Sequence, residues 1–545
     1  MLLEESRVPA RNGNRPPMTP RKTATARADL HARLLRSAAA TRAKVWTAPL
    51  ALLLGAVSVL AFAPFGIASL AVVCLAGLFW LSERRSFAGA AGLGLLFGVG
   101  QFGVGTAWLF GALHDVGGVP VALSLLLLTL LVLVLALYPA LVMGLAARLA
   151  PGPGARRYLL MLPALWILAE WLRSWLLTGF PWLSVGYSQI GTPLAGYVPL
   201  LGVFGASGAV ALSAGLLLQL RAGPRAHRWR AIAALALLWI GGGLLHQVDW
   251  THPIGAPLRI SLVQGAVVQS GKWDAGAAAR DLHLYQRLTH GHEGSDLIVW
   301  PETAIPDDYR AVRPELAALG AGLQARGATL LTGVLRTTAD GKRTYNSVAA
   351  VGAASGFYDK RHLVPFGEYF PVPGFVRRWL AGLALPHDDL SSGAARQPSL
   401  TVAGLPVGLS ICYEDAFGNE IIAALPTAAL LVNVSNDAWF GRSIGPEQHF
   451  QMARMRALET GRYLLRADNS SVTGVVDPHG AVRQRLPGFE PGVLTTEIRP
   501  YGGTTPFVRW GNAAILGLTT VALLVITAWR TTADIGKRPN GGASG

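Results

Sequence analysis

LPVGLSICYEDAF, residues 405–417, combines the pattern of a buried strand with a reactive side chain at its end. Apolar residues occupy alternate positions from 407 to 411, which predicts a strand with one face in a core. Cys412 ends this run, and the carboxylates of Glu414 and Asp415 follow. A thiol at a strand end beside acidic groups is a candidate nucleophile. The alternative is a cysteine that packs as a small apolar residue in a core.

Two further strand-like runs also lead to a charged side chain. SDLIVWPETA (295–304) leads to Glu302, and GFYDKRHLVP (356–365) leads to Lys360. A carboxylate can take the proton of a thiol, whose ordinary pKa is about 8.5. An ammonium can stabilise the thiolate and later an oxyanion. Glu302, Lys360 and Cys412 therefore form a sufficient set for acyl transfer through a thioester.

Other kinds of site lack support in the sequence. The second cysteine, Cys74, lies in a wholly apolar segment, so no disulfide framework is indicated. The histidines do not follow a metal-ligand spacing such as HExxH, and no GxSxG pattern is present. We therefore expect neither a metal ion nor an organic cofactor at the site.

The composition indicates a membrane protein. The chain has 545 residues, of which 51% are hydrophobic and only 14% charged, and its net charge is +16. Residues 255–500 contain 23 basic and 23 acidic residues, so the whole excess lies elsewhere, beside apolar segments. This placement is typical of residues that orient membrane helices, and it removes the main argument for a nucleic-acid partner.

Eight apolar segments predict membrane-spanning helices. A helix needs roughly 20 apolar residues to cross the hydrocarbon core, and most of the segments are long enough, although the second is short. They lie at about 45–63, 67–82, 88–112, 119–147, 158–178, 200–220, 229–247 and 511–529.

The loops between these segments alternate in charge. If the N-terminus is cytoplasmic, the loops near 64–66, 113–118 and 179–199 are outside, and they carry no Lys or Arg. The inner loops and the C-terminal tail carry many, including Arg84 and Arg228. Because basic residues favour the cytoplasmic side, we predict eight spans with both ends inside.

The predicted organisation follows from these spans. It consists of a disordered basic cytoplasmic arm at 1–44, helices one to seven at 45–247, an outer domain at 248–510, helix eight at 511–530 and a cytoplasmic tail at 531–545. From residue 257 onward, short strands alternate with helices at about 273–291, 313–326 and 446–460, which predicts an α/β domain. In a bacterium this outer domain is periplasmic.

Three segments allow more than one interpretation. GVGQFG (98–103) matches a dinucleotide-type pattern, but it lies inside an apolar segment, where glycines allow close helix packing. TGFPWLSVGYSQIG (178–191) is either an aromatic belt at the membrane interface or a re-entrant loop that forms the floor of a lipid site. PVPGFVRRWLAGLALP (371–386) either packs on the outer domain or forms a mobile lid.

The motifs resemble those of a known family. WPETAIP, YDKRHLVPFGEYFP and SICYEDAF are similar to the three signatures of the nitrilase (carbon–nitrogen hydrolase) superfamily, with its Glu-Lys-Cys triad. NVSNDAWFG, HFQMARMRALETGRYLLRADN and the eight-span frame resemble the membrane-bound apolipoprotein N-acyltransferase family within it. The resemblance covers about 45–530. It implies an αββα sandwich inserted between the seventh and eighth helices of an eight-helix bundle.

The resemblance also implies a reaction and a set of residues. A fatty acyl chain would pass from a phospholipid to the N-terminal amine of a diacylglyceryl-cysteine apolipoprotein, at the inner membrane of a bacterium and in a monomer. Glu302 would be the general base, Lys360 the oxyanion-side cation and Cys412 the acyl-carrying nucleophile. Four residues match supporting positions of the family: Glu368, Tyr413, Glu414 and Trp273.

Two other functions stay open. A membrane-anchored amidase or nitrilase would use the same three residues on a small carbon–nitrogen substrate, with water as the acceptor. Eight spans favour the acyltransferase, because a simple tether needs only one. A transporter with an outer binding domain would place acidic or basic residues within its spans, and Glu170 is nearly the only acidic one.

Overall fold

The computed structural model describes residues 46–221, 225–370 and 389–535. Two compact units are distinguished, Met1–Leu50 and Ala51–Gly545. Of the first unit only residues 46–50 are described, and they are helical. All other described residues belong to the second unit. The predictions of a disordered arm at 1–44 and of a lid at 371–386 lie outside the described residues, as does the tail beyond 535.

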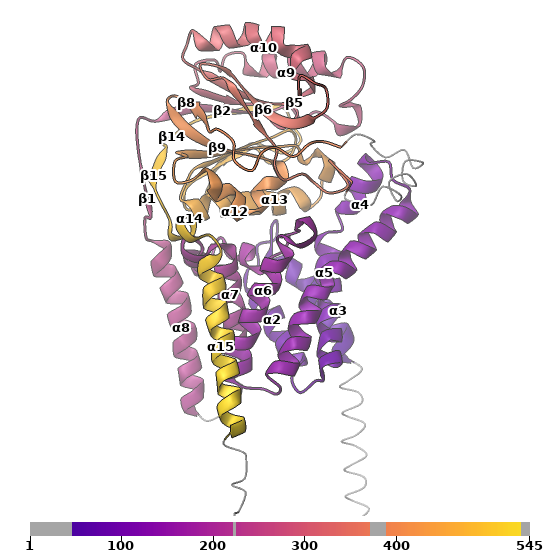
Figure 1. Ribbon diagram of the computed structural model, residues 1–545, viewed down its shortest axis with the longest axis vertical. Coiled ribbons are helices and arrows are strands. Elements are labelled where there is room, and N and C mark those ends of the chain that lie inside the picture. The colour runs from indigo at the N-terminus through magenta and orange to yellow at the C-terminus, as the bar shows by residue number, and fades with distance from the viewer. Residues whose placement is uncertain (1–45, 222–224, 371–388, 536–545) are drawn as a thin grey trace, which may run out of the picture. The chain divides into compact units, whose positions relative to one another are not determined.

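The N-terminal part of the second unit is a group of apolar helices (Figure 1). Four helices described in the structure are long and apolar enough to cross a membrane, at Phe87–Gly105, Val121–Leu149, Pro193–Gln219 and Arg225–His246, and three shorter apolar helices cover Trp46–Ala61, Ser69–Leu81 and Ala513–Ile526. On Val121–Leu149 (α5), Leu126 and Leu137 are more than half exposed. Large apolar side chains at the surface of a long apolar helix are typical of contact with lipid.

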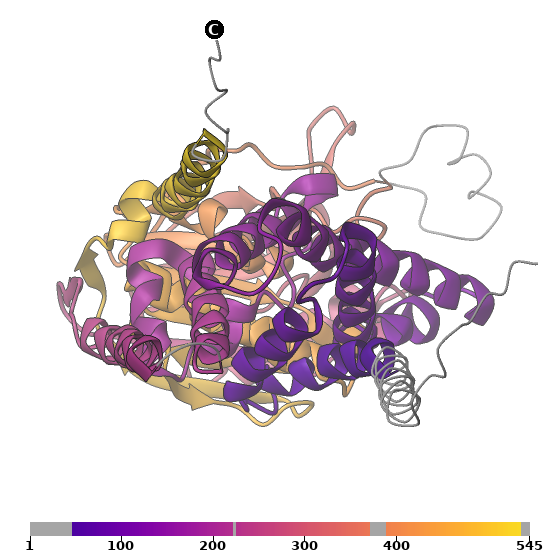
Figure 2. The ribbon, with the colours of Figure 1, turned by 90° about the horizontal axis from the view of Figure 1, so that it is seen from below.

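Each predicted span contains helix, but the segments differ in length. After the first helix, Trp46–Ala61, come α2 (Ser69–Leu81), α3 (Phe87–Gly105), the short α4 (Leu109–Gly111), α5, α6 (Leu162–Arg173), α7 (Val198–Gln219), α8 (Arg225–His246) and α15 (Ala513–Ile535). α3 and α4 both lie in the third predicted segment. Seen from below, α15 (yellow) and α8 (pink) stand at the edges of this group (Figure 2). The eight-span topology stays a prediction.

Glycines in α3 allow it to pack closely against α5. A Cβ atom on Gly94 would lie 2.4 Å from the carbonyl oxygen of Pro139, and one on Gly98 would lie 2.6 Å from the Cα of Ala136. The pattern GVGQFG therefore serves helix packing, and the dinucleotide interpretation is wrong because the pattern lies in the middle of a helix.

The second part of the unit is an α/β domain with two large sheets. The seven-stranded sheet contains β14 (Gly492–Ile498), β2 (Leu258–Gln264), β3 (Leu297–Val299), β5 (Thr329–Thr337), β6 (Thr344–Gly352) and β7 (Gly356–Asp359) in that order, with β4 (Ile305–Asp308) paired to β5. The six-stranded sheet has the order β13 (Val482–Arg485), β12 (Gly474–Val476), β11 (Leu464–Asp468), β10 (Leu430–Ser435), β9 (Leu405–Ile411) and β8 (Leu400–Val402). β1 (Thr251–Pro253) pairs with β15 (Tyr501–Gly503).

The two sheets face each other and helices cover their outer faces. Apolar residues of both sheets, such as Ile260 on β2 and Val432 on β10, share one buried core. α9 (Ala277–Thr289) and α10 (Tyr309–Gln324) pack on the outer face of the seven-stranded sheet. α12 (Gly418–Ile421) and α13 (Gly445–Thr460) pack on the six-stranded sheet. The predicted αββα sandwich is confirmed.

α13 joins the sandwich to the helical part. Ala453 and Ala457 face the six-stranded sheet, whereas Met455 and Leu458 belong to the core of the helical region. The short helix α14 (Pro506–Trp510) packs against α7 and leads into α15.

The loop at 178–191 lies beneath the sandwich. Residues 181–190 are all buried, and the indole of Trp182 donates a hydrogen bond to Gln448 Oε1 on α13 at 2.7 Å. The side chains of Glu170 and Arg173 on α6 hold this loop: Glu170 Oε1 accepts from the Val185 amide, and Arg173 donates to the Trp182 carbonyl. Trp182 and Tyr187 are enclosed by protein and Phe180 is partly buried, which does not fit the aromatic-belt interpretation.

Candidate active site

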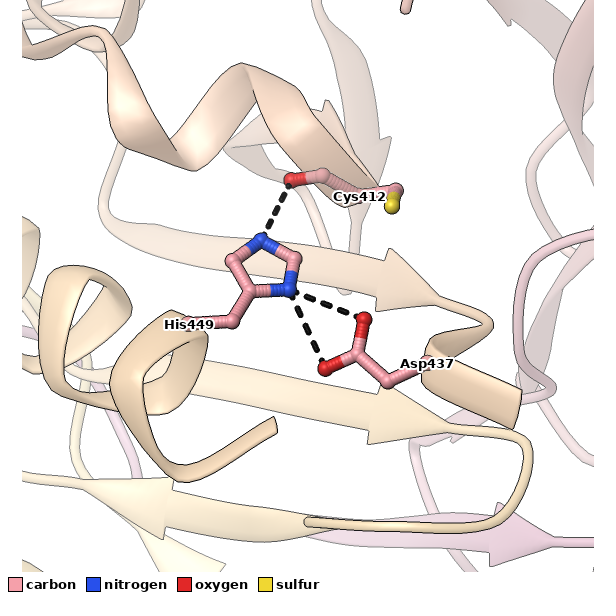
Figure 3. A group of neighbouring side chains, drawn as sticks. All are labelled: Cys412, Asp437 and His449. Carbon is pink, nitrogen blue, oxygen red and sulfur yellow. Dashed lines mark hydrogen bonds and ion pairs between the residues drawn. The ribbon is translucent and has the colours of Figure 1, made fainter. Parts of the chain in front are cut away.

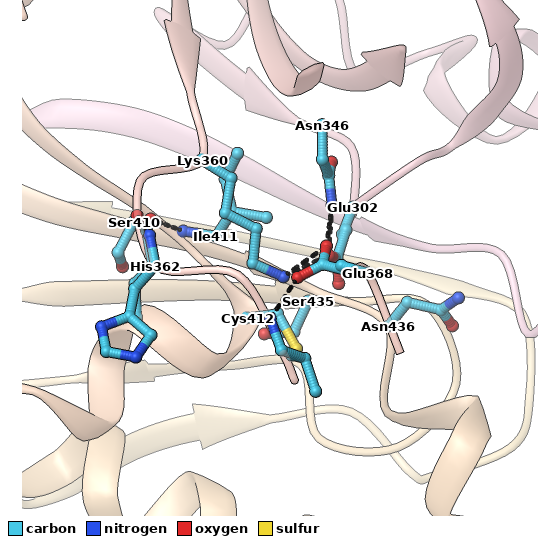
Figure 4. Close-up of polar contacts among 12 residues, drawn as sticks. Glu302, Asn346, Lys360, His362, Glu368, Ser410, Ile411, Cys412, Ser435 and Asn436 are labelled. Carbon is cyan, nitrogen blue, oxygen red and sulfur yellow. Dashed lines mark hydrogen bonds and ion pairs between the residues drawn. The ribbon is translucent and has the colours of Figure 1, made fainter. Parts of the chain in front are cut away.

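Cys412 lies where β9 ends. The strand is parallel to β10, and the residues after Ile411 form a short helical turn, Cys412–Ala416. Cys412 itself has φ +50°, a left-handed conformation that non-glycine residues rarely adopt. Such a conformation costs about 1–3 kcal/mol and persists only where the surroundings fix it. Figure 4 shows Cys412 at this bend, below the side chains of Lys360 and Glu368.

Glu302 stands on the loop between β3 and β4. The residue after it, Thr303, also has a positive φ of +48°. The loop presses on β5, where Gly333 donates its N–H to the Pro301 carbonyl at 3.2 Å. A Cβ atom at Gly333 would lie 2.3 Å from Thr303 N and 2.4 Å from Pro301 O. Only a residue without a side chain therefore allows the loop to hold Glu302 in this place.

Lys360 follows β7 and brings two carboxylates together. Its ammonium lies 3.3 Å from Glu302 Oε1 and 2.9 Å from Glu368 Oε1. Asn346 on β6 donates to the same two oxygens, at 2.7 and 3.1 Å. Within the described part of the chain, the other Glu302 oxygen, Oε2, has no hydrogen bond and stays available as an acceptor. Figure 4 shows these side chains gathered above Cys412.

The charges at the site favour a neutral thiol beside an ammonium. Burial raises the pKa of the Cys412 thiol well above its ordinary value, and Glu302 raises it further, whereas Lys360 lowers it. Burial alone would lower the pKa of Lys360, but Glu302 and Glu368 outweigh it and raise that pKa well above the ordinary value. The resting nucleophile is therefore protonated, and a proton acceptor is needed before it can attack.

Glu414 and Tyr413 hold the turn that carries Cys412. The fully buried Glu414 carboxylate accepts hydrogen bonds from the amides of Ile411 and Arg361, both at 2.7 Å, and from the Tyr358 hydroxyl. The Tyr413 hydroxyl donates to the Gly179 carbonyl in the helical part at 2.8 Å. These two residues thus position the nucleophile.

Trp273 stands apart from this group. It is 56% exposed, on the loop before α9. Its neighbour Lys272, which the motifs did not single out, is buried, and its ammonium donates to the Glu302 carbonyl oxygen at 3.5 Å. Burial lowers the pKa of Lys272 to about 8. A second cation therefore lies behind the Glu302 loop.

A buried charge network below Cys412 was not predicted from the sequence. His449 on α13 lies 2.9 Å from Asp437 and 2.9 Å from Asp415, and its Nε2 is 3.3 Å from the Cys412 carbonyl oxygen. Arg466 on β11 pairs with the same two carboxylates, at 2.8 and 2.9 Å. The motifs NVSNDAWFG and HFQMARMRALETGRYLLRADN contain Asp437, His449 and Arg466. Charged residues within these largely apolar strand and helix patterns were the signal that could have revealed the network.

Cys412, Asp437 and His449 also lie close enough to bind a metal ion, with possible ligand atoms within 4.8 Å of one another (Figure 3). The donor set does not suit one. Both His449 nitrogens face carboxylates, and the adjacent Arg466 guanidinium already neutralises these groups. Burial would lower the pKa of His449, but Asp415 and Asp437 raise it to about 9, so the ring is a cation rather than a ligand.

Comparison with known proteins covers nearly the whole chain. The family described as "Apolipoprotein N-acyltransferase N-terminal domain" matches residues 54–216, and the family "Carbon-nitrogen hydrolase" matches residues 259–505. The apolipoprotein N-acyltransferase of Methylococcus capsulatus is 45% identical over 459 residues, which are 84% of this chain and 91% of that protein. That of Nitrosomonas europaea is 43% identical over 476 residues, 86% of this chain and 95% of that protein.

A solved structure is more distantly similar. The match with a carbon–nitrogen hydrolase superfamily protein from Xanthomonas campestris covers 45% of this chain and 91% of that protein, at 21% identity and a TM-score of 0.35. The long matches at more than 40% identity assign the family. This chain belongs to the apolipoprotein N-acyltransferases, membrane-associated enzymes of the carbon–nitrogen hydrolase superfamily.

Proposed function

We propose that the chain transfers a fatty acyl group from a membrane phospholipid to the N-terminal amine of a diacylglyceryl-cysteine apolipoprotein, by way of a thioester on Cys412. The observation that carries this mechanism is the position of the Cys412 thiol beside Lys360 and Glu302, whose ammonium and carboxylate lie 3.3 Å apart. The names of the family's members supply the substrate class.

In the first half-reaction, Glu302 Oε2 takes the thiol proton while Cys412 Sγ attacks the ester carbonyl carbon. Lys360 stabilises the oxyanion that forms. The bond from the carbonyl carbon to the glycerol oxygen then breaks, and Glu302 gives its proton to that oxygen. The products are a thioester and a lysophospholipid. Glu368 and Asn346 keep Lys360 and Glu302 in place during these transfers.

In the second half-reaction, the acceptor amine attacks the thioester. Glu302 takes a proton from the amine, the carbon–sulfur bond breaks, and Cys412 is released as a thiol after it regains a proton. Tyr413 and Glu414 keep the turn in position through both steps. Trp273, which is largely exposed, would contact a substrate on the open side. Since one chain supplies all of these groups, a monomer suffices.

The membrane arrangement belongs to the same proposal. Eight spans with both ends in the cytoplasm would place 248–510 at the outer face of the inner membrane. The charge of the loops supports this orientation, because basic residues gather on one side only. A phospholipid chain gains roughly 0.8 kcal/mol for each methylene that stays in the bilayer, so a thiol close to the outer leaflet suits this donor.

Trapping the thioester tests the proposal. Purified protein is incubated with phospholipid and no acceptor, and the peptide that contains Cys412 is analysed by mass spectrometry before and after hydroxylamine. We expect a hydroxylamine-sensitive acyl group on Cys412 in the unsubstituted protein. Cys412→Ser should insert normally and lose at least about a thousandfold in turnover. Normal turnover in this variant would contradict the nucleophile, and cleavage of small amides without an acyl group from lipid would favour an amidase.

A further inference from the structure

Three consecutive apolar side chains are exposed just after α6 ends. Trp175 is 50% exposed, Leu176 39% and Leu177 77%, and they lie at the end of the fifth predicted span. We call these three residues the tip. Large apolar side chains cost free energy when they stay in contact with water, so a continuous group of them indicates an apolar partner.

The backbone around the tip is a closed loop in a rare conformation. Its two ends bind each other: the Phe180 amide donates to the Arg173 carbonyl at 2.8 Å, and the Arg173 guanidinium donates to the Phe180 carbonyl at 2.6 Å. Leu177 and Thr178 have φ +54° and +75°, in the left-handed region that non-glycine residues rarely adopt. Such a conformation persists only where neighbouring contacts fix it.

The sandwich supplies these contacts at two consecutive carbonyl groups. His362 Nε2 lies 3.0 Å from the Thr178 carbonyl oxygen, and the Tyr413 hydroxyl donates to the Gly179 carbonyl at 2.8 Å. Tyr413 is next to the nucleophile in the chain, and His362 comes two residues after the lysine of the site. The tip is therefore bonded to both segments that carry these catalytic groups.

His362 also packs against the turn of the nucleophile. Its ring stacks on Phe417, with centroids 3.7 Å apart and 14° between the planes, and Phe417 follows the turn that Cys412 begins. Its Nδ1 lies 2.7 Å from Glu420 Oε1 on α12. Figure 4 shows the His362 ring pointing away from the Lys360 ammonium. The residue thus acts on the site through position and not by proton transfer.

Other exposed aromatic residues lie at the same end of the helical part. The Ala63 amide donates to Gln451 Oε1 on α13 at 3.2 Å, which places the loop after the first helix beside the sandwich, and Phe65 in this loop is 49% exposed. Trp510, which ends α14 shortly before α15, is 62% exposed. Exposed aromatic residues at one end of apolar helices are typical of the zone where a protein meets lipid headgroups. A lipid surface is therefore the partner that suits the tip.

We propose that the tip rests in the phospholipid surface next to the sandwich and sets the depth of Cys412 above the bilayer, with His362 as a positioning residue. Because the Thr178 and Gly179 carbonyls follow the tip directly, lipid that holds the tip also holds the two segments bonded to them. An acyl donor that stays in the bilayer then meets the thiol at the correct height, whereas a soluble ester does not need the tip. The identity of the lipid as the natural donor rests on the proposed function.

Fluorescence quenching tests the contact with lipid. In a Cys74→Ala, Cys412→Ser background, Leu177→Cys is labelled with nitrobenzoxadiazole, and the full chain is placed in phosphatidylcholine nanodiscs with a lipid that carries a nitroxide near its headgroup. We expect at least about twofold stronger quenching than at Gln324→Cys. Gln324 is exposed on α10, on the side of the sandwich away from the helical part (Figure 1). Equal quenching at the two positions would mean that lipid does not cover the tip, and would overturn the proposal.

Two esters with the same leaving group test the coupling to the site. Acyl-enzyme formation is followed by release of p-nitrophenol from p-nitrophenyl palmitate held in nanodiscs and from soluble p-nitrophenyl butyrate. His362→Phe keeps a ring but removes both hydrogen bonds. It should slow the reaction of the palmitate ester about tenfold and that of the butyrate ester less than about twofold. His362→Gln, which restores a donor near the place of Nε2, should recover at least about half of the lost rate.

A variant of the tip completes the test. Trp175→Ser with Leu177→Ser should raise the KM for the palmitate ester at least about fivefold and leave the reaction of the butyrate ester unchanged. Leu518→Ser, at an exposed position of α15, is the matched control and should change neither reaction. Equal losses with both esters in His362→Phe would show a merely structural residue, and an unchanged KM in the tip variant would contradict the contact. If the palmitate ester depends on the tip but phospholipid leaves no acyl group on Cys412, the proposed function fails and the role of the tip stands.

Discussion

At the scale of single residues, the state of Cys412 follows from burial first and from charge second. Burial and the nearby carboxylates, Glu302 first, raise the pKa of the thiol and hold the proton on sulfur, whereas Lys360 lowers that pKa. Reaction therefore depends on a base that removes this proton at the moment of attack. Lys360 and Asn346 both bind Glu302 through Oε1, which leaves Oε2 for that task.

This arrangement predicts that Glu302→Gln has opposite effects on two reactions of the same sulfur. Formation of the acyl-enzyme should slow by about 10²–10⁴-fold, because the proton acceptor is lost. Alkylation by iodoacetamide at about pH 8, close to the ordinary thiol pKa of about 8.5, should become faster, since a charge that raises the pKa of Cys412 has been removed. Both rates can be measured on one preparation.

The exposed Glu315 on α10 offers a matched control. Glu315→Gln should change neither rate, since its carboxylate lies on the surface of the domain. If Glu302→Gln slowed alkylation as much as acylation, the residue would support the fold of the site rather than accept a proton.

Much of the residue-level site could be predicted from the sequence, because a charged residue after an apolar run lies at a strand end. Glu302, Lys360, Glu368 and Cys412 do lie together. Asn346 could not be found in this way, since it lies within β6 and nothing local marks its contact with two glutamates. The left-handed backbone at Cys412 is equally invisible, because tertiary contacts impose it.

At the scale of elements, the fit between β5 and the Glu302 loop depends on Gly333. In Gly333→Ala the added Cβ would lie 2.3 Å from Thr303 N and 2.4 Å from Pro301 O, so the loop has to move away from β5. Overpacking of this kind costs about 1–3 kcal/mol in stability. We expect a lower thermal midpoint and a larger loss in the rate of acyl-enzyme formation, since Glu302 moves with the loop.

Gly322→Ala on α10 is the corresponding control. No atom lies within 4 Å of the Cβ that it would add, and the position is exposed and helical. It should stabilise the helix by about 0.5–1 kcal/mol and leave the acylation rate unchanged. A Gly333→Ala variant with normal acylation would show that the loop does not need this close approach.

The network of His449 ties β9, β10, β11 and α13 together and predicts a dependence of stability on pH. An unfolded histidine titrates near 6.5, whereas the pKa of His449 in the folded chain is about 9. Its contribution is fully present below pH 6.5 and is lost as the pH rises through about 9. Stability should therefore fall across this window, by up to about 3 kcal/mol from this group.

Thermal unfolding in detergent at several pH values measures this effect. His449→Gln should lower stability and flatten its fall between about pH 6.5 and 9, whereas His283→Gln, at an exposed position of α9, should change neither. An unchanged slope in His449→Gln would mean that another group binds the proton.

At the level of elements, the alternation of strands and helices was predicted correctly because local periodicity determines it. The sequence does not reveal that α13 is buried on both sides, by a sheet and by the membrane helices. Its apolar residues are not confined to one stripe, and its charged residues Arg456 and Glu459 pair within the interior. The role of loop 178–191 stayed open in the sequence analysis because its burial beneath the sandwich is likewise not visible in the sequence.

At the scale of the whole molecule, the sandwich and the helical part are joined by specific hydrogen bonds. Tyr413 binds the Gly179 carbonyl, Trp182 binds Gln448, and Glu459 binds the Val203 amide. All of these contacts are buried, so they hold the thiol at a fixed place relative to the ends of the membrane helices. The side of the membrane on which those helix ends lie then determines which leaflet can supply the acyl donor.

This reasoning makes the orientation of the helices testable. In a Cys74→Ala, Cys412→Ser background, Lys342→Cys and Arg228→Cys place single thiols on exposed segments of the sandwich and of the N-terminal turn of α8. Because Arg228 belongs to the basic loops, we expect it on the cytoplasmic side. A membrane-impermeant maleimide should label Lys342→Cys in spheroplasts and Arg228→Cys only after lysis. The reverse pattern would put Cys412 on the arginine-rich side and make the inner leaflet the donor, which contradicts the proposed function.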